Sequence, residues 1–241
     1  MDSISLADFT RDLDAYTPAT NEGDTLEFVA PRLHYASQDS NRQLSCCLDW
    51  RADVQLAVAE AHATAPDISV GYVDFLILQL GQQPAAQVLD EYPGAARFGQ
   101  LFDGEWLAPD IDEQGPFAAA GSIDVVLIVV DVCIDSAARG HNIGAWAVSE
   151  VIATMLPTSA GMAVMSPDVS RSTAETVERV NRYWRLAGLQ PIDGHPGFLG
   201  QATAFTHLDA ARRALADVRD TTFRVPVAEL RARVERNDVR R

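Results

Sequence analysis

The stretch that decides the fold of this 241-residue chain is residues 123–155, which read IDVVLIVVDVCIDSAARGHNIGAWAVSEVIATM. Residues 123–134 predict a buried strand, because their centre, 125–130, is an unbroken apolar run. A turn that contains two glycines follows at 139–144. The apolar residues after it recur at helical spacing and predict a helix: Ala145, Val148, Ile152 and Met155.

A strand that enters a glycine turn and then a helix predicts a site for an anion. The first N–H groups of a helix have no partner inside the helix, and the helix dipole adds partial positive charge at that end. Gly140 and Gly144 allow the backbone to come close to a bound group. We therefore expect residues 139–145 to hold an anion such as a pyrophosphate through backbone groups.

The same turn resembles motif A of the GNAT superfamily of N-acetyltransferases, because Arg139, Gly140, Ile143 and Gly144 match its Arg-Gly-x-Gly-Ile-Gly form. Asn142 replaces one motif glycine, and asparagine tolerates left-handed backbone angles better than most residues. Three other segments resemble family elements in the expected order. Residues 69–80 resemble the third strand, and residues 161–165 resemble the fifth strand. The helix 175–187, together with the sequence YWRLAGL at 183–189, resembles motif B. The resemblance covers roughly residues 25–207.

This resemblance implies an α/β fold with a mixed, mostly antiparallel central sheet flanked by helices. Residues 1–206 would form the acyltransferase domain, with an insertion at 81–122 between the third and fourth strands. Residues 207–241 would form a helical C-terminal extension. We expect the insertion to be either a lid over the substrate side or a flap that forms a homodimer. The extension would pack on the body or mediate dimerisation.

The resemblance also implies an acetyl-CoA-dependent N-acetyltransferase, which moves an acetyl group to an amine of a small molecule or a protein. The backbone of Val132, Cys133 and Ile134 would pair with the pantetheine arm of the donor. The pyrophosphate would lie against Arg139, Gly140, His141, Asn142, Ile143, Gly144 and Ala145. Arg139 would either contact the phosphates or brace the turn.

The general base is the part of this chemistry that the sequence leaves open. Family members often place Glu or His on the fourth strand, at positions that here are the apolar Ile128 and Val130. Asp131 and Asp135 have the opposite strand parity and would face the other side of the sheet or cap the turn, unless a bulge shifts the strand. Ordered water and Glu105, from the insertion, are the alternatives.

The general acid is also open. The motif B tyrosine, which often protonates the leaving thiolate, aligns with Trp184, whose indole cannot do this. Tyr183 is adjacent, about 100° away around the helix, and is either the candidate catalytic residue or a packed core aromatic. Because these positions depart from the family pattern, the alternative function is a non-catalytic CoA-binding or scaffold domain. A Rossmann domain is disfavoured, since no Gly-x-Gly-x-x-Gly follows the first strand.

The amino-acid composition limits the classes of molecule that we expect this protein to bind. Residues 1–206 carry 28 acidic side chains against 10 arginines, which disfavours nucleic acid and favours amine-bearing small molecules. The chain contains no lysine, which excludes Schiff-base chemistry. Three cysteines without a Cys-x-x-Cys pair, no apolar N-terminal segment and no membrane-length apolar run predict a cytoplasmic protein without a membrane partner. The five histidines form no metal motif.

Periodicity predicts the remaining elements. Helices are expected at 5–16, 54–65, 84–92, 208–219 and 226–235, and strands at 26–36, 43–51 and 198–206. An aromatic and aliphatic cluster is expected within the insertion: Phe98, Leu101, Phe102 and Trp106.

Overall fold

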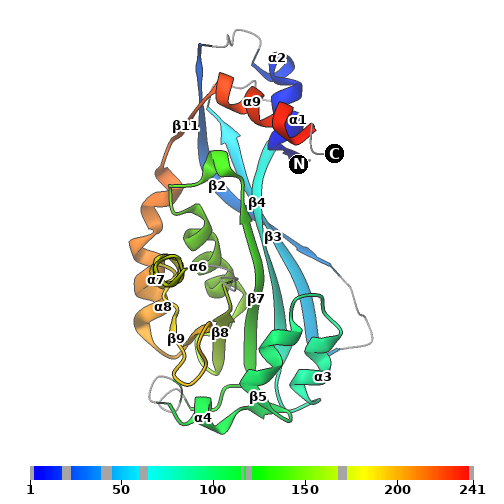
Figure 1. Ribbon diagram of the computed structural model, residues 1–241, viewed down its shortest axis with the longest axis vertical. Coiled ribbons are helices and arrows are strands. Elements are labelled where there is room, and N and C mark those ends of the chain that lie inside the picture. Colours follow the sequence, from blue (N-terminus) through cyan, green and yellow to red (C-terminus); the bar gives the residue numbers. More distant parts are fainter. Residues whose placement is uncertain are drawn as a thin grey trace.

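The computed structural model describes residues 3–17, 23–38, 45–59, 65–114, 117, 121–167 and 173–238. In these ranges the centre is a nine-stranded mixed sheet in the order β11-β2-β3-β4-β7-β8-β10-β9, with β1 alongside β4 (Figure 1). Its strands are β1 Ser3–Ser5, β2 Thr25–Ser37, β3 Cys47–Val58, β4 Asp67–Gln79, β7 Val125–Ile134, β8 Gly161–Met165, β9 Gln190–Pro191, β10 Leu199–Ala202 and β11 Phe223–Pro226. The pairs β7–β8 and β1–β4 are parallel, and the other neighbours are antiparallel.

Helices flank this sheet, as Figure 1 shows. They are α1 Leu6–Arg11, α2 Leu13–Tyr16, α3 Ala85–Asp90, α4 Pro109–Asp112, α6 Ile143–Met155, α7 Ala174–Arg185, α8 Thr206–Ala214 and α9 Val227–Asp238. Short 3₁₀ helices occur at η1 Ala96–Leu101, η2 Ser136–Ala138 and η3 Ala216–Asp220, and a small hairpin joins β5 Phe102–Asp103 to β6 Trp106–Leu107. The predicted α/β class with a mixed sheet is confirmed. Within the described ranges, every helix is too short or too polar to cross a membrane.

The N-terminal helix begins where the sequence predicts it. The Ser5 side chain accepts a hydrogen bond from the Asp8 N–H at 3.1 Å, which caps the first turn of α1. Leu6, Phe9 and Leu13 are buried against the sheet. The predicted helix is interrupted at Asp12, so that α1 and α2 are two short helices in one segment.

The predicted helix at 54–65 is wrong for its first five residues, since Val54–Val58 continue β3. Val58 lies opposite Phe28 of β2, and Leu56 lies opposite Ile68 of β4. Both faces of this strand segment are buried, so the alternation of apolar and polar residues that marks a half-exposed strand is lost. Residues 59 and 65 are not helical either, and residues 60–64 of that prediction lie outside the described residues.

The two faces of the sheet carry separate hydrophobic cores. One core lies under α6 and α1 and includes Leu127 and Trp146. The other lies under the long β4–β7 connection, residues 80–124, and includes Ile128 and Phe98. Of the predicted cluster in this connection, Phe98, Leu101 and Phe102 are buried, whereas Trp106 is 52% exposed.

Polar contacts join the β4–β7 connection to residues 193–198, which lie between β9 and β10 at the edge of the sheet. The His195 ring lies 2.8 Å from the Asp110 carboxylate of α4, and Gln114 exchanges hydrogen bonds with the backbone of Asp193. Phe98 also packs edge-on against Phe198, with ring centroids 5.6 Å apart. The connection is thus anchored at three places along its length to the segment 193–198.

The C-terminal segment packs on the same sheet. The predicted strand at 198–206 is shorter, because Thr206 already begins α8, and the predicted helix at 208–219 is divided into α8 and η3. β11, which the sequence does not predict, pairs antiparallel with β2. Glu150 of α6 is buried and receives hydrogen bonds from Arg212 and Arg219, so charged contacts join this segment to α6.

Candidate functional site

The strand β7 has two halves with different neighbours. From Val125 to Val129 it pairs with β4 on one side and with β8 on the other. The last β7–β8 partners are Val129 and Met165, and from Asp131 to Ile134 the register includes β4 alone. β7 and β8 therefore separate at Val130, which leaves one backbone edge of the second half of β7 without a strand partner in the described residues.

A β-bulge marks the point of separation. Phe75 of β4 lies opposite Val129 and Asp74 lies opposite Asp131, so that Val130 is the extra residue. The bulge shifts the strand parity that the sequence suggests: Asp131 lies on the same sheet face as Asp74 and Ile128. This is the face that the β4–β7 connection partly covers. The sequence left this possibility open, and the structure has the bulge.

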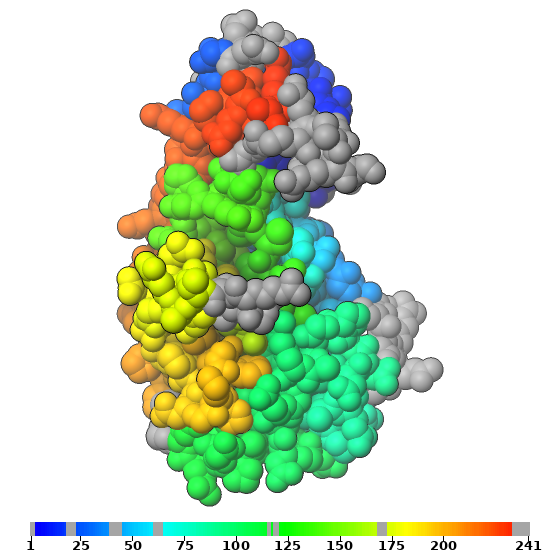
Figure 2. Space-filling view, in the orientation of Figure 1, coloured from blue at the N-terminus to red at the C-terminus, as the bar shows by residue number. Residues whose placement is uncertain are grey.

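The separated strands and the turn before α6 enclose a cavity of about 290 Å³, which we call the turn cavity. Its lining includes eight residues predicted from the sequence as site residues: Val132, Ile134, Arg139, Gly140, Asn142, Ile143, Gly144 and Tyr183. Ala138 and Trp184 complete it. In Figure 2, α7 (yellow) lies beside the green surface formed by residues of the turn and β7.

The turn has the backbone geometry that its glycines and asparagine suggest. Gly140 has φ of 89°, and Asn142 has φ of 59°, in the left-handed region that asparagine tolerates. The Nε of Arg139 donates to the Ile134 carbonyl oxygen at 2.8 Å and so braces the turn. Asn142 stands at the N-cap of α6, and its side chain makes no capping hydrogen bond among the described residues.

The Tyr183 side chain provides a hydrogen-bond acceptor for a backbone N–H group at the N-terminus of α6. Its hydroxyl oxygen accepts a hydrogen bond from the Ala145 N–H at 3.0 Å. Burial raises the pKa of Tyr183 above its ordinary value, while the hydrogen bonds from the N–H groups of Ala145 and Gly144 act in the opposite direction. The phenol marks the point where these backbone N–H groups converge, and its ring packs edge-on against Trp184 at 4.9 Å.

The other predicted site residues lie outside the turn cavity. Cys133 is exposed on the opposite face of β7, where it is the cross-strand partner of Tyr72. His141 is exposed and packs edge-on against Phe223 of β11, with ring centroids 4.9 Å apart. Ala145 is fully buried and contributes only its N–H, through Tyr183.

A second cavity, the strand cavity, begins where the first ends and has a volume of about 610 Å³. It is lined by Asp74, Pro93, Gly94, Arg97, Val129, Val130, Asp131, Val132, Met165, Ser166, Pro167, Val180 and Trp184. Val132 and Trp184 border both cavities. Pro93, Gly94 and Arg97 come from the β4–β7 connection, which therefore contributes to this cavity and not to the turn cavity.

Glu105, the base candidate from the connection, lies at the other end of β7. Its carbonyl oxygen accepts a hydrogen bond from the Gly81 N–H, next to the start of β7. Five residues of strand, roughly 17 Å, separate that end from Val130. Arg97 and Asp74 are not among the predicted site residues, because nothing local in either segment indicates that they meet at this cavity.

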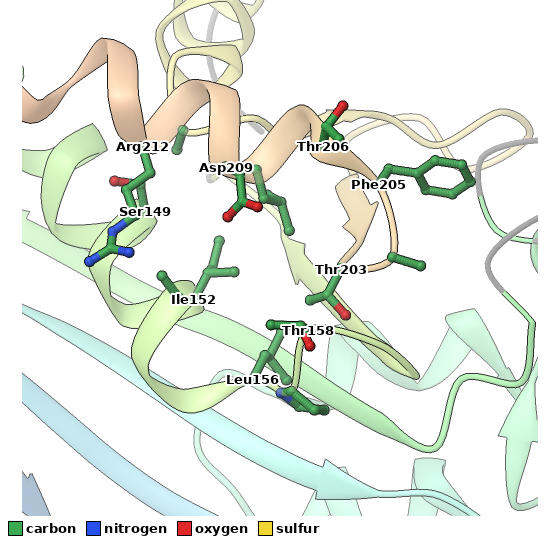
Figure 3. A pocket seen from close by; sticks show the side chains of 14 residues that line it. Ser149, Ile152, Leu156, Thr158, Thr203, Phe205, Thr206, Asp209 and Arg212 are labelled. Carbon is green, nitrogen blue, oxygen red and sulfur yellow. The ribbon is translucent and has the colours of Figure 1, made fainter.

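A third cavity, of about 260 Å³, lies between α6 and α8. Figure 3 shows Asp209 of α8 directed toward it, above Ile152 of α6, with Leu156, Thr158 and Thr203 around the cavity. It contains none of the predicted site residues.

The described residues also bring together no group of three or more His, Cys, Asp or Glu side chains that would hold a metal ion. The chain matches no protein-family model, no curated protein and no solved structure.

Proposed function

We propose that this protein is an acetyl-CoA-dependent N-acetyltransferase with a GNAT-like fold. One observation carries the proposal: β7 separates from β8 at the Val130 bulge, directly before a glycine turn and the N-terminus of α6. This arrangement combines a free strand edge with convergent backbone N–H groups. A long ligand with an amide-containing arm and a phosphate group fits such a combination.

The order of elements also supports the proposal. Four antiparallel strands, β2 to β4 and β7, precede a parallel β7–α6–β8 unit, and α7 follows β8 at the separated ends. In the GNAT-like reading, the β4–β7 connection is an insertion between the third and fourth family strands. Its residues Pro93 and Arg97 border the strand cavity, on the side proposed for the acceptor.

The residues of the turn cavity suit the donor. The N–H groups of the turn from Gly140 onward would hold the pyrophosphate, next to Ala145, whose N–H already donates to the Tyr183 hydroxyl. The edge of β7 near Val132 and Ile134 would pair with the pantetheine amides through groups other than the Ile134 carbonyl oxygen, which accepts from Arg139. Apart from Gly140 and its two chain neighbours, no described residue has an atom within 4 Å of the point where a Cβ on Gly140 would be, so there is room for a phosphate against this backbone. Arg139, held to Ile134, keeps the turn in shape.

When bound, acetyl-CoA would supply an acetyl group activated as a thioester. The acceptor amine would approach from the strand cavity, and the reacting carbon would lie near Val132 and Trp184, which border both cavities. Trp184 has no acidic proton to give a thiolate. Asp131 is the carboxylate that the bulge brings to this side of the strand.

The alternative, a CoA-binding domain without catalysis, is favoured by one observation. The Tyr183 hydroxyl is directed at the Ala145 N–H, and Tyr183 does not line the strand cavity. A site with no tyrosine and no histidine among the residues that line it would bind the donor and leave it intact.

Two measurements together test both functions. Isothermal titration calorimetry with CoA tests donor binding, and thiol release from acetyl-CoA tests transfer, against polyamines, aminoglycosides, amino acids and peptides. Binding with amine-dependent thiol release is the expected result. Binding without release for every acceptor favours the alternative, and absence of CoA binding refutes both.

A further inference from the structure

Two side chains of opposite charge line the strand cavity on either side of the bulge. Asp131 follows the bulged Val130 in β7, and Arg97 comes from η1 in the β4–β7 connection. The Arg97 Nη2 donates to the Val130 carbonyl oxygen at 3.0 Å, so both groups are tied to the same point of the strand. Both side chains are exposed to the cavity and the solvent.

The Asp131 carboxylate is held by its neighbours on the sheet. The Tyr72 hydroxyl donates to its Oδ2 at 2.9 Å, and the guanidinium of Arg51 lies 4.2 Å above the centre of the Tyr72 ring. Arg51 in turn donates two hydrogen bonds to Asp74, at 2.6 and 2.7 Å. Burial and the bond to Asp131 raise the pKa of Tyr72 to about 12, so the phenol remains a donor at neutral pH.

The cavity contains a third charged group, but its charge is neutralised. The bidentate bond from Arg51 satisfies the Asp74 carboxylate, so Asp74 offers little attraction to a ligand. Across the described ranges, in contrast, no arginine lies within ion-pair distance of Asp131 and no acid within that distance of Arg97. The cavity therefore has one negative and one positive group available to a ligand.

We propose that the acceptor is a small zwitterionic amine, such as a free amino acid, whose ammonium group lies at Asp131 and whose carboxylate lies at Arg97. This inference rests on the proposed acetyltransferase function. A ligand with one charge would leave one of the two groups without a partner in the cavity, whereas a zwitterion pairs with both. Arg97 presents a planar fork that matches a carboxylate.

The reaction at this site balances without a further reagent. The ammonium loses one proton to water, the nitrogen forms a bond to the acetyl carbon, and the carbon–sulfur bond breaks. The second proton leaves the nitrogen as the amide forms and neutralises the thiolate, so one proton is released to solvent for each acetyl group transferred. Asp131 orients the amine, and Tyr72 is a positioning residue that acts through Asp131.

Matched pairs of acceptors test the inference in the full-length protein. Each L-amino acid is compared with its carboxamide, which keeps the amine and lacks the carboxylate. For the wild type we expect kcat/KM to be about tenfold or more higher for at least one free amino acid than for its amide, since an ion pair with Arg97 is lost. Saturation-transfer NMR should show the same preference in binding.

Variants separate the roles of the two charges. Arg97→Gln should reduce the acid-to-amide ratio to near one, and Arg97→Lys should restore part of it. Asp131→Asn should raise KM about tenfold for both members of a pair, with a smaller change in kcat. Tyr72→Phe should raise KM in the same direction by less. The matched control is Asp53→Asn, which makes the same charge change on the same sheet face, opposite Tyr72, and lines neither cavity.

The outcomes distinguish this inference from the proposed function. If CoA binds and amides are used or bound as well as amino acids, or if no amino acid binds by NMR, the zwitterion inference is wrong. If amino acids bind in an Arg97- and Asp131-dependent manner while CoA does not bind, the acetyltransferase proposal fails and the zwitterion site stands. Equal effects of Asp53→Asn and Asp131→Asn on KM would also overturn the zwitterion inference, since a general effect of the lost charge would then explain both.

Discussion

The two halves of β7 differ in their neighbours far more than in their composition. Residues 125–129 have strand partners on both sides, and Val126 to Val129 are buried. Residues 130–134 are separated from β8, and Val130, Asp131 and Val132 border the strand cavity. A single strand thus contributes to the core with its first half and to a candidate site with its second. Stability and binding should therefore respond to different substitutions along it.

The largest expected effect is on stability, from Leu127→Ala in the first half. Leu127 is fully buried, so its truncation should lower the free energy of unfolding by about 3 kcal/mol. Val132→Ala, in the second half, should cost only about 1 kcal/mol, because Val132 is half-buried. Urea denaturation measures both values. In the folded proteins, Leu127→Ala should leave CoA affinity within about twofold, and Val132→Ala should weaken it. The reverse pattern would refute the division of β7 into two halves.

The next effect is on binding, at the end of the second half. Gly144→Asp places a carboxylate at the N-terminus of α6, where the proposed pyrophosphate lies, and should weaken CoA binding by about a hundredfold or more. A Cβ on Gly144 would lie 2.8 Å from the Tyr183 hydroxyl oxygen, so crowding contributes as well. Gly144→Ala carries the same Cβ without the charge and serves as the control in calorimetry. A loss of equal size in both variants would assign the effect to crowding alone.

The first half of β7, the turn and α6 were predictable because their signals are local. An apolar run, two glycines and helical spacing suffice to place them, and β8 and α7 also agree closely with the predicted 161–165 and 175–187. The bulge at Val130 was not predictable in the same way, since it depends on how β7 pairs with β4. One extra residue changes the face on which Asp131 lies. Because the residues on both sides of Asp131 are apolar, the sequence pattern does not reveal the bulge.

Other features depend on contacts between segments far apart in the chain. β11 has four residues and is a strand because β2 lies beside it. Val54 to Val58 have apolar residues at spacings that also suit a helix, and pairing with β2 and β4 decides in favour of a strand. Arg97 reaches the strand cavity because the β4–β7 connection folds back over the sheet. Most of the turn cavity was therefore predictable, and most of the strand cavity was not.

A smaller effect concerns the backbone of the turn that follows the second half of β7. Asn142 has φ of 59°, so Asn142→Val should lower the free energy of unfolding by about 1–2 kcal/mol, since a β-branched residue is strained there. Asn142→Gly should change it by less than about 0.5 kcal/mol, because glycine adopts this conformation readily. Chemical denaturation of the pair measures the difference. Equal stability of the valine and glycine variants would mean that the turn relaxes to another conformation.

The smallest expected effect, on turnover, comes from Tyr183→Phe. The Tyr183 hydroxyl faces the Ala145 N–H in the turn cavity and Tyr183 does not line the strand cavity, so it is remote from the proposed acceptor. Turnover should fall by less than about tenfold, or roughly 1.4 kcal/mol of transition-state stabilisation. With an acceptor amine whose pKa is near that of the lysine side chain, about 10.4, the wild-type rate should rise with pH well above pH 8, because that amine loses its proton to water. Stopped assays of thiol release across pH measure both.

Tyr183→Phe should also change how the free energy of unfolding depends on pH. The pKa of Tyr183 is raised by burial, so the neutral phenol is favoured in the folded protein. Its contribution to stability is complete below the ordinary tyrosine pKa of 10.0 and is lost as the pH rises through the higher folded-state value. The wild type should be more stable than Tyr183→Phe at pH 8, because the variant loses the hydrogen bond from the Ala145 N–H, and this advantage should shrink above pH 10, where ionisation of the buried phenol is penalised. A loss of turnover of about a hundredfold or more, in a variant that is folded and still binds CoA, would instead make Tyr183 the acid that protonates the thiolate.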